Sequence, residues 1–381
     1  MSAASPRQAR WAVTVTFFLH GLLIGGWVPH IPLAKERLDV GPAAFGLALL
    51  AIAAGAVCGM PITGALINRF GSARITVVTG VLFCLAFLGP VLAPDMPRFA
   101  IAGFLMGMMI GSMDVAMNAH GIAVEKALKL PTMSMFHGAF SVGGMSGAFI
   151  GALLLHAFGE YVQAAVTSAV CLALLAGATR FLLPPEVDKG LSGSHFAWPT
   201  AATIGLGLLC FLALMIEGSI LDWAAIMMRE KFLVDAAFAA LAFGLYQGGM
   251  AVARFSGDWL RLKVGAVRLV MVSALMAAAG TSVALIVPSP WAAIAAFVFA
   301  GLGIGNVAPV LFAGGGRLEP DAPGRGIAAV TTLGYSGFLA GPPLIGFAAQ
   351  LTSLPLALGL TVVAALIIAA FARMVDAADR F

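Results

Sequence analysis

The chain has 381 residues, of which 61% are hydrophobic and only 10% carry a charge, and its mean hydropathy is +1.02. Soluble globular domains carry about a quarter charged residues, so this composition excludes them and predicts an integral membrane protein. The formal net charge of +4 does not indicate a nucleic-acid binder, because the basic residues are scattered between apolar stretches and form no patch.

Apolar runs of about twenty residues follow one another along the chain, and each is long enough to cross ~30 Å of hydrocarbon as a helix. Strands of a membrane barrel would be about half as long and would alternate in polarity, so the runs predict an all-α protein. We expect twelve transmembrane helices, at approximately 11–33, 42–67, 73–93, 98–123, 132–156, 160–183, 200–227, 237–260, 266–288, 291–313, 325–350 and 355–375.

The longest polar interval, PPEVDKGLSGSH, follows the sixth run. We therefore predict two six-helix halves, 1–183 and 200–381, joined by a cytoplasmic linker at 184–199. Most of the 21 Lys and Arg residues fall on the side that holds both termini, and the positive-inside rule places that side in the cytoplasm. The basic residues expected on the opposite side are Lys35, Arg37, Arg98, Arg229 and Lys231.

An internal repeat supports the division into halves. A shift of 193 or 194 residues lays AKERL (34–38) over MREKF (228–232). The same shift superimposes pairs of glycines, placing Gly107 and Gly111 on Gly301 and Gly305, and Gly143 and Gly147 on Gly337 and Gly341. Duplication of a six-helix unit in the same orientation explains both matches.

The loop after the second run reads GALINRFGSAR, and the loop after the eighth reads GDWLRLKVGAVR. This pattern resembles the signature loop of the major facilitator superfamily, Gly-x-x-x-Asp-Arg-x-Gly-Arg-Arg, at its expected place. The resemblance implies two pseudo-symmetric six-helix halves and a monomer. It also implies gating residues, for which the candidates are Asn68, Arg69, Arg74 and Asp258. Asn68 stands where the family has an acid, which weakens the charged latch, and the arginines are equally explained as positive-inside anchors.

Four further segments resemble the bacterial MosC-like branch of this superfamily, which includes the rhizopine-associated membrane protein. They read DVAMNAHGIAVEK (114–126), FHGAFSVGGMSGA (136–148), EGSILDW (217–223) and GFLAGPPLIG (337–346). Members of this branch are transporters, mostly with unassigned substrates, so the resemblance implies transport and names no cargo.

Asp114 and Asn118 lie in the fourth apolar run, four residues apart, and therefore on one helix face. A charged side chain facing lipid near the bilayer centre costs on the order of 3 kcal/mol or more, so this face must meet protein or water. Asp114 is a candidate proton carrier and Asn118 a candidate solute ligand, unless the two only satisfy each other. His120 is expected at the cytoplasmic interface.

Glu217 lies in the middle of the seventh run, where burial of a carboxylate favours a group that can load and release a proton. Asp222, nearer the outer end, is a second proton-coupling candidate or a partner that holds the helix end against Arg229. His137 in the fifth run completes the proton-coupling candidates, although a lone membrane histidine is often a packed hydrogen-bonding residue.

The remaining polar and aromatic side chains inside the runs are candidates for solute contact, because aromatic faces beside amides suit a polar ring such as a sugar or cyclitol. The superfamily resemblance adds that the first, fourth, seventh and tenth helices line a central cavity. The candidates are His20, Trp223, Tyr246, Gln247, Asn306 and Tyr335. For tryptophans, and especially for Trp27, an interfacial aromatic belt is the alternative.

These features predict a secondary transporter of a small polar solute in a bacterial inner membrane, with the proton gradient as driver and no cofactor. The absence of GxxxxGK[ST] argues against direct use of ATP. Symport is favoured, because the fourth run has no arginine after Arg98 and the fifth lacks a Gly-Pro motif, both of which occur in drug antiporters of the superfamily. Efflux is the runner-up, and an enzyme is remote because HExxH and GxSxG are absent. Apart from the solute and the lipid bilayer, no partner is expected.

Overall fold

The computed structural model describes residues 5–130, 132–184, 197–319 and 321–379. Every regular element in these ranges is a helix, so the predicted all-α class is confirmed. The chain divides into two compact units, which are treated separately below. Unit 1 comprises residues 1–39 and 51–192, and unit 2 comprises 40–50 and 193–381. The predicted linker at 184–199 lies almost wholly outside the described residues, so the boundaries of the halves stay predictions.

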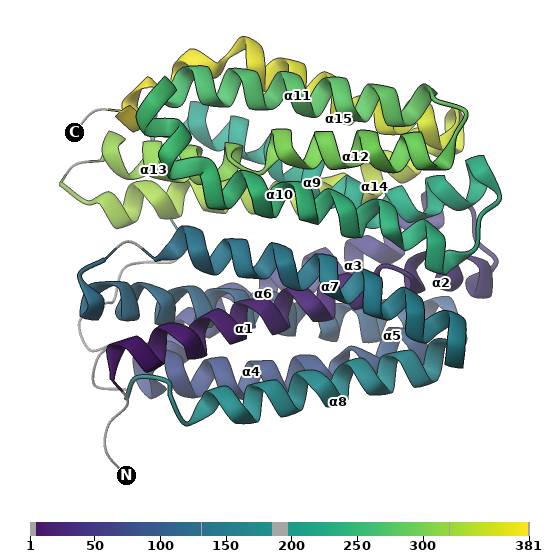
Figure 1. Ribbon diagram of the computed structural model, residues 1–381, viewed down its shortest axis with the longest axis horizontal. Helices are drawn as coiled ribbons and strands as arrows, with labels where there is room; N and C mark the ends of the chain where they lie inside the picture. Colours follow the sequence, from purple (N-terminus) through teal and green to yellow (C-terminus); the bar gives the residue numbers. More distant parts are fainter. Residues whose placement is uncertain (1–4, 131, 185–196, 320, 380–381) are drawn as a thin grey trace. The chain divides into compact units, whose positions relative to one another are not determined.

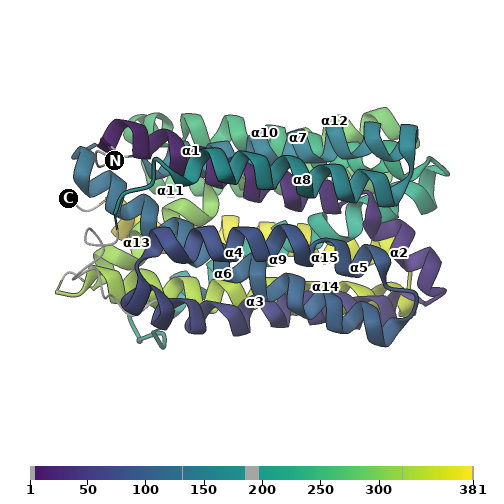
Figure 2. The same cartoon turned by 90° about the horizontal axis from the view of Figure 1, so that it is seen from below.

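Unit 1 is a bundle of long helices that run nearly along one direction (Figures 1 and 2). Its elements are α1 (Pro6–Trp27), α2 (His30–Leu38), the larger part of α3 (Pro42–Phe70), α4 (Ser72–Ala86), α5 (Leu88–Leu92), α6 (Met96–Leu128), α7 (Met133–Phe158) and α8 (Glu160–Thr179).

Unit 2 has the same architecture and also receives the first residues of α3. Its other elements are α9 (Ile204–Phe232), α10 (Ala236–Val264), α11 (Ala266–Ile286), α12 (Pro290–Ile304), α13 (Val307–Leu318), α14 (Pro323–Leu351), α15 (Leu354–Ala370) and the 3-10 helix η2 (Ala372–Asp379).

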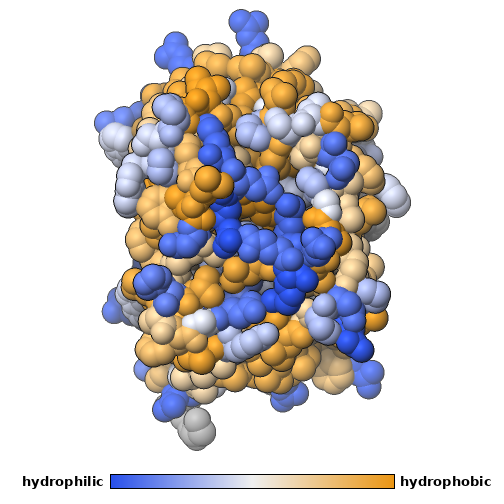
Figure 3. Space-filling model, turned by 90° about the vertical axis from the view of Figure 1, so that its right-hand side faces the viewer, coloured by the Kyte–Doolittle hydropathy of each residue, from blue (hydrophilic) through white to orange (hydrophobic). Residues whose placement is uncertain are grey.

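Ten helical stretches in the described ranges are long and apolar enough to cross a membrane, or eleven if α15 and η2, bent by 52°, form one span. The helices at the eleventh and twelfth predicted spans, α14 and α15, fall outside these ten, and α15 has only 17 residues. Hydrophilic side chains gather at the helix ends that face the viewer in Figure 3. The multi-pass character of the chain is therefore confirmed, and the count of twelve stays a prediction.

Four predicted spans are interrupted. The third, expected at 73–93, divides into α4 and α5, and the twelfth, expected at 355–375, divides into α15 and η2. The first was expected as one helix over 11–33, but the chain breaks between α1 and α2, where Pro29 precedes His30. Proline has no backbone N–H to donate to a helical hydrogen bond, and its ring clashes with the preceding turn. The tenth span, expected at 291–313, breaks into α12 and α13 at Gly305 and Asn306.

Helices α1 and α7 of unit 1 approach each other closely. A side chain at Gly143 would collide with the backbone carbonyl of Phe18, so only glycine permits this crossing. In unit 2, Gly337 of α14 lies in the same way against the carbonyl of Phe211 on α9. A shift of 193 or 194 residues therefore maps both the glycine and its contact from one unit to the other.

A second pair of crossings repeats this correspondence. Gly107 of α6 lies against the carbonyl of Ile52 on α3 in unit 1, and Gly301 of α12 lies against the carbonyl of Tyr246 on α10 in unit 2. Ile52 and Tyr246 are 194 positions apart, as are the two glycines. The internal repeat thus has a physical basis in backbone contacts that exclude any side chain.

Candidate functional site

Glu217 and Arg254 form an ion pair inside the membrane-spanning helices of unit 2. Glu217 lies near the middle of α9 and Arg254 lies within α10, and 3.5 Å separates Glu217 Oε1 from an Arg254 terminal nitrogen. The two side chains are only 14% and 9% exposed, respectively. Removal of Arg254 would leave the Glu217 carboxylate, which is largely buried, without its counter-ion, which is strongly unfavourable.

Arg254 was missing from the predicted site, because a basic residue near a helix end was attributed to the cytoplasmic side. The structure corrects this assignment, since the guanidinium turns toward Glu217. A single signal could have found it: Arg254 falls inside the apolar run predicted at 237–260, and charged residues within such runs are rare and paired.

Tyr246 and Gln247 lie on α10 about two helical turns before Arg254. Their side chains are 1% and 2% exposed, and Tyr246 interacts electrostatically with both Glu217 and Arg254. Within the described ranges, the Tyr246 hydroxyl and Gln247 Oε1 have no hydrogen-bond partner. Buried polar atoms of native proteins are almost always hydrogen-bonded, so these two atoms indicate a place where water or solute is expected.

Trp223, a predicted candidate on α9, packs against the first part of α3. This side chain is fully buried and meets Phe45 edge to face at 6.2 Å, so it does not belong to an interfacial belt. Its indole nitrogen and the Ser219 hydroxyl are further buried atoms without a described partner. Asp222 is half-buried and makes no hydrogen bond or ion pair with any described residue, so the expected contact with Arg229 is not formed.

Asn306 and Tyr335 are the other candidates in unit 2. Asn306 is 5% exposed at the break between α12 and α13, where its side-chain oxygen lies against Gly257. Tyr335 of α14 is half-buried, and its ring stacks on Phe338 with centroids 6.3 Å apart. No described contact brings either residue to Glu217.

In unit 1, Asp114 of α6 is hydrogen-bonded to a side chain of the same helix. Asn118 Nδ2 donates to the Asp114 carboxylate at 3.2 Å and to the Asp114 backbone carbonyl at 2.8 Å. This is the mutual satisfaction that the sequence left open as an alternative. Further along α6, Glu125 accepts from the backbone nitrogens of Thr132 and Met133 and thereby caps α7.

The two predicted histidines of unit 1 differ in burial. His20 is 2% exposed between the rings of Phe83 and Phe140, and neither ring nitrogen has a described partner. His137 is half-buried, with its ring edge to face with Phe17 at 5.3 Å. His20 therefore has no hydrogen bond to Asp114 in the described part of the chain.

His120 is buried, at 1% exposure, and its expected place at the cytoplasmic interface stays a prediction. Its Nδ1 lies 2.7 Å from the Ser72 hydroxyl, and its Nε2 accepts the backbone N–H of Leu183 at 3.1 Å. His120 on α6 therefore contacts both α4, through Ser72, and the segment after α8, through Leu183.

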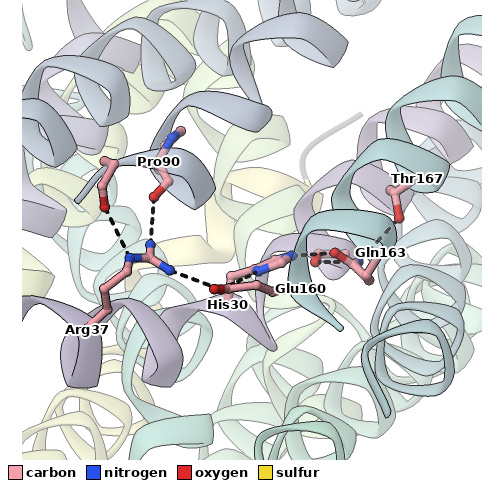
Figure 4. A network of polar contacts seen from close by, with 8 residues as sticks. His30, Arg37, Pro90, Glu160, Gln163 and Thr167 are labelled. Atoms are coloured by element: carbon pink, nitrogen blue, oxygen red, sulfur yellow. Dashed lines mark hydrogen bonds and ion pairs between the residues drawn. The ribbon is translucent and has the colours of Figure 1, made fainter. Parts of the chain in front are cut away.

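A polar network around α2 was not predicted (Figure 4). Arg37 donates to Glu160 at 2.9 Å and to the carbonyls of Pro90 and Ala93 at 2.9 and 3.1 Å. His30 pairs with Gln163, which donates to the Gly26 carbonyl. The repeat contained a signal for this network, because Arg37 corresponds to Lys231. Lys231 also donates to a backbone carbonyl, that of Leu285 at the end of α11.

The predicted gating residues lie at helix ends. Asn68, Arg69, Arg74 and Asp258 are all exposed. The Arg69 guanidinium lies 5.1 Å from the centre of the Phe70 ring. Within the part of the chain that the structure describes, no group of three His, Cys, Asp or Glu residues could hold a metal ion.

Comparisons with known proteins match the superfamily that the sequence resembles. Residues 13–215 match the family model described as Major Facilitator Superfamily. An uncharacterised MFS-type transporter of Yersinia pestis is 35% identical over 362 residues, which cover 95% of this chain and 94% of the relative. The membrane protein MosC of Rhizobium meliloti is 30% identical over 362 residues, which cover 94% of this chain and 88% of the relative.

Solved structures share the fold. A point mutant of the nucleoside transporter NupG superimposes with a TM-score of 0.76 at 12% identity, covering 96% of this chain and 99% of that one. A bacterial homologue of the lysosomal transporter Spinster, in an inward-facing conformation, gives a TM-score of 0.74 at 14% identity, covering 99% and 98%. At such low identity, the likeness extends to the fold alone.

Proposed function

This chain belongs to the major facilitator superfamily and is a multi-pass membrane transporter, and from this premise we propose that it moves a small polar solute by proton-coupled symport. Both resemblances predicted from the sequence, to the superfamily and to the MosC-like branch, are confirmed by the relatives. The family and the Yersinia pestis relative, an MFS-type transporter, identify the chain as a transporter and not an enzyme.

The Glu217–Arg254 pair carries the proposal. The two charges cancel within the span, so the deprotonated transporter has a neutral cluster at this point. Proton binding to the Glu217 carboxylate removes the attraction and releases Arg254 for other contacts. Proton occupancy of Glu217 therefore determines what Arg254 can bind, and this dependence is what coupling requires.

Solute contact is assigned to the buried polar atoms beside the pair. Tyr246, Gln247, Ser219 and Trp223 offer hydroxyl, amide and indole groups from two adjacent helices. Such a mixture of aromatic faces and single polar atoms suits a hydroxylated ring. Alternating access by rocking of the halves, a monomeric state, a bacterial inner membrane and cytoplasmic termini complete the proposal.

Proton movement in proteoliposomes tests it. The purified protein is reconstituted with a pH-sensitive dye, and sugars, cyclitols, amino acids and hydrophobic drugs are added in turn. We expect a solute-evoked proton flux in the wild type that Glu217→Gln abolishes and Glu230→Gln preserves, because Glu230 is an exposed carboxylate on the same helix. Flux toward the solute-containing side would indicate efflux by antiport, and an unchanged flux in Glu217→Gln would contradict the assignment.

Asp114→Asn is the second variant in this assay. The Asn118 bond to the Asp114 backbone carbonyl survives the change. We therefore expect the variant to retain most of the flux, as a local hydrogen-bonding role requires. Loss of flux equal to that of Glu217→Gln would instead make Asp114 a proton carrier.

A further inference from the structure

A buried histidine lies at the break between α1 and α2, at the opposite end of α1 from the N-terminus. His30 is 1% exposed, and its Nδ1 has no hydrogen-bond partner among the described residues. Its ring stacks on Trp27, with centroids 5.9 Å apart, and lies edge to face with the ring of Phe87. Buried polar atoms of native proteins are almost always hydrogen-bonded, so the bare Nδ1 needs an explanation.

The contacts of Gln163 determine which nitrogen of His30 carries the proton. Gln163 Nε2 donates to the Gly26 carbonyl at 3.1 Å and to the Thr167 hydroxyl at 3.2 Å. A carbonyl can only accept, so the amide nitrogen faces Gly26 and the amide oxygen faces His30 Nε2. Nε2 is therefore the donor of the neutral ring, and Nδ1 has a lone pair without a proton.

The bare nitrogen faces a carboxylate (Figure 4). Glu160 Oε2 lies 3.9 Å from His30 Nδ1, and the Glu160 side chain, at the start of α8, is 22% exposed. While the ring is neutral, two acceptors face each other and make no hydrogen bond. A proton on Nδ1 would turn them into a cationic donor and an anionic acceptor, which form a charge-assisted hydrogen bond.

We propose that His30 and Glu160 form a proton-binding site, separate from Glu217, and that the proton determines whether Glu160 binds the start or the end of α2. Arg37, near the end of α2, donates to the same Glu160 oxygen at 2.9 Å. His30 and Arg37 are seven residues apart and lie on one face of α2. Without the proton, Glu160 binds Arg37. With the proton, the imidazolium is a second donor that competes with Arg37 for Glu160.

Glu160 is the acid that faces His30, and Arg37 is the opposing base. Within the described ranges, every ion pair of His30 is with Glu160. The other contacts of the ring are with Trp27 and Phe87, which carry no charge. Arg37 opposes a second cation, and the carboxylate that both cations approach offsets this repulsion. Histidine ordinarily changes its charge between about pH 5 and 8, so the site responds to the pH of the water at this end of unit 1.

Unit 2 lacks the equivalent pair. A shift of 194 residues maps His30 onto Ala224 and Glu160 onto Leu354, and neither of these side chains binds a proton. The glycine crossings, in contrast, occur in both units. The proton-binding pair is therefore an addition to the common fold, and the fold does not depend on it.

Nitrogen NMR of the protein with isotopically labelled histidine tests the site. The chain has six histidines, and the His30→Gln variant identifies the signals of His30. We expect the wild-type ring to carry a proton on Nε2 alone at about pH 8 and on both nitrogens at about pH 5. His120 is the internal control, because its Nε2 already accepts the Leu183 N–H at 3.1 Å and its ring should stay neutral.

Two variants should move the protonation of His30 in opposite directions. Glu160→Gln removes the counter-charge and should lower the ratio of protonated to neutral ring about tenfold at a given pH, since a nearby carboxylate favours the cation. Arg37→Gln removes the competing cation and should raise that ratio. Arg98→Gln is the matched control, because Arg98 is exposed and pairs with Asp95.

Melting temperature in detergent gives an independent measurement. The added hydrogen bond exists only in the protonated form, so lowering the pH from about 8 to about 6 should stabilise the wild type more than His30→Gln. The same ring protonation in Glu160→Gln and the wild type, with both proteins folded by thermal melting, overturns the proposal. A wild-type ring that keeps a single proton at about pH 5 overturns it as well. Neither measurement uses a solute or Glu217, so failure here leaves the proposed function standing.

Discussion

At the positions where unit 2 carries Glu217 and Arg254, the repeat places Ile24 and Met60 in unit 1. Conversely, Asp114 of unit 1 corresponds to Ala308 of unit 2. In unit 1, Asp114 accepts a hydrogen bond from Asn118 one turn along the same helix, whereas Glu217 of unit 2 forms an ion pair with a residue on another helix.

The glycine crossings, by contrast, are the same in both units. The difference has a physical reason. A glycine that allows two backbones to touch cannot be replaced without moving both helices, so duplication retains it. A polar side chain affects mainly its nearest neighbours and can differ between the copies. Shared packing therefore coexists with a charged cluster in one unit.

The largest expected effect concerns the shared packing. Gly143→Val in unit 1 and Gly337→Val in unit 2 should each cost more than about 3 kcal/mol, because the new side chain meets a backbone carbonyl that cannot move aside. Gly177→Val is the matched control, since that glycine has open space around it. Thermal melting in detergent measures the effect. If one of the two crossings tolerates valine, the packing equivalence of the units is wrong.

The next expected loss of stability comes from breaking the Glu217–Arg254 ion pair. Arg254→Met alone should destabilise the protein by about 3–5 kcal/mol, since Glu217 is left without its counter-ion. The double variant Glu217→Ile, Arg254→Met gives unit 2 the residues of unit 1, and it should recover most of that stability while proton flux stays absent. Melting temperature and dye-monitored flux are measured together. If the double variant is as unstable as the single one, the two residues cannot be replaced together by those of unit 1 without a loss of stability, and this part of the comparison is wrong.

The smallest expected effect concerns Arg37, near the end of α2, and Lys231, its counterpart near the end of α9. Arg37→Lys loses donors to Glu160 and two carbonyls, so we expect a loss of about 1 kcal/mol after allowing for partial exposure. Lys231→Arg keeps a donor for the Leu285 carbonyl and should change stability by no more than about 0.5 kcal/mol. Equal shifts in melting temperature would mean that the Arg37 network adds nothing beyond a cation at a helix end.

The sequence by itself determined the fold class, the family and the duplication. Hydropathy along the chain is a local property, and backbone contacts at glycine leave a periodic trace that survives in both copies. Glu217 was also identifiable, because a carboxylate within an apolar run is conspicuous whatever surrounds it.

Only the tertiary structure decided which groups meet. Arg254 lies on a different helix from Glu217, and their pairing depends on how α10 rotates against α9. The same holds for His30 with Gln163, on helices far apart in the sequence, and for the enclosure of Trp223 by Phe45. Asn118 with Asp114 was open to prediction because four residues separate them on one helix. Helical period fixes neighbours within a helix, whereas neighbours between helices follow from packing, which no local pattern encodes.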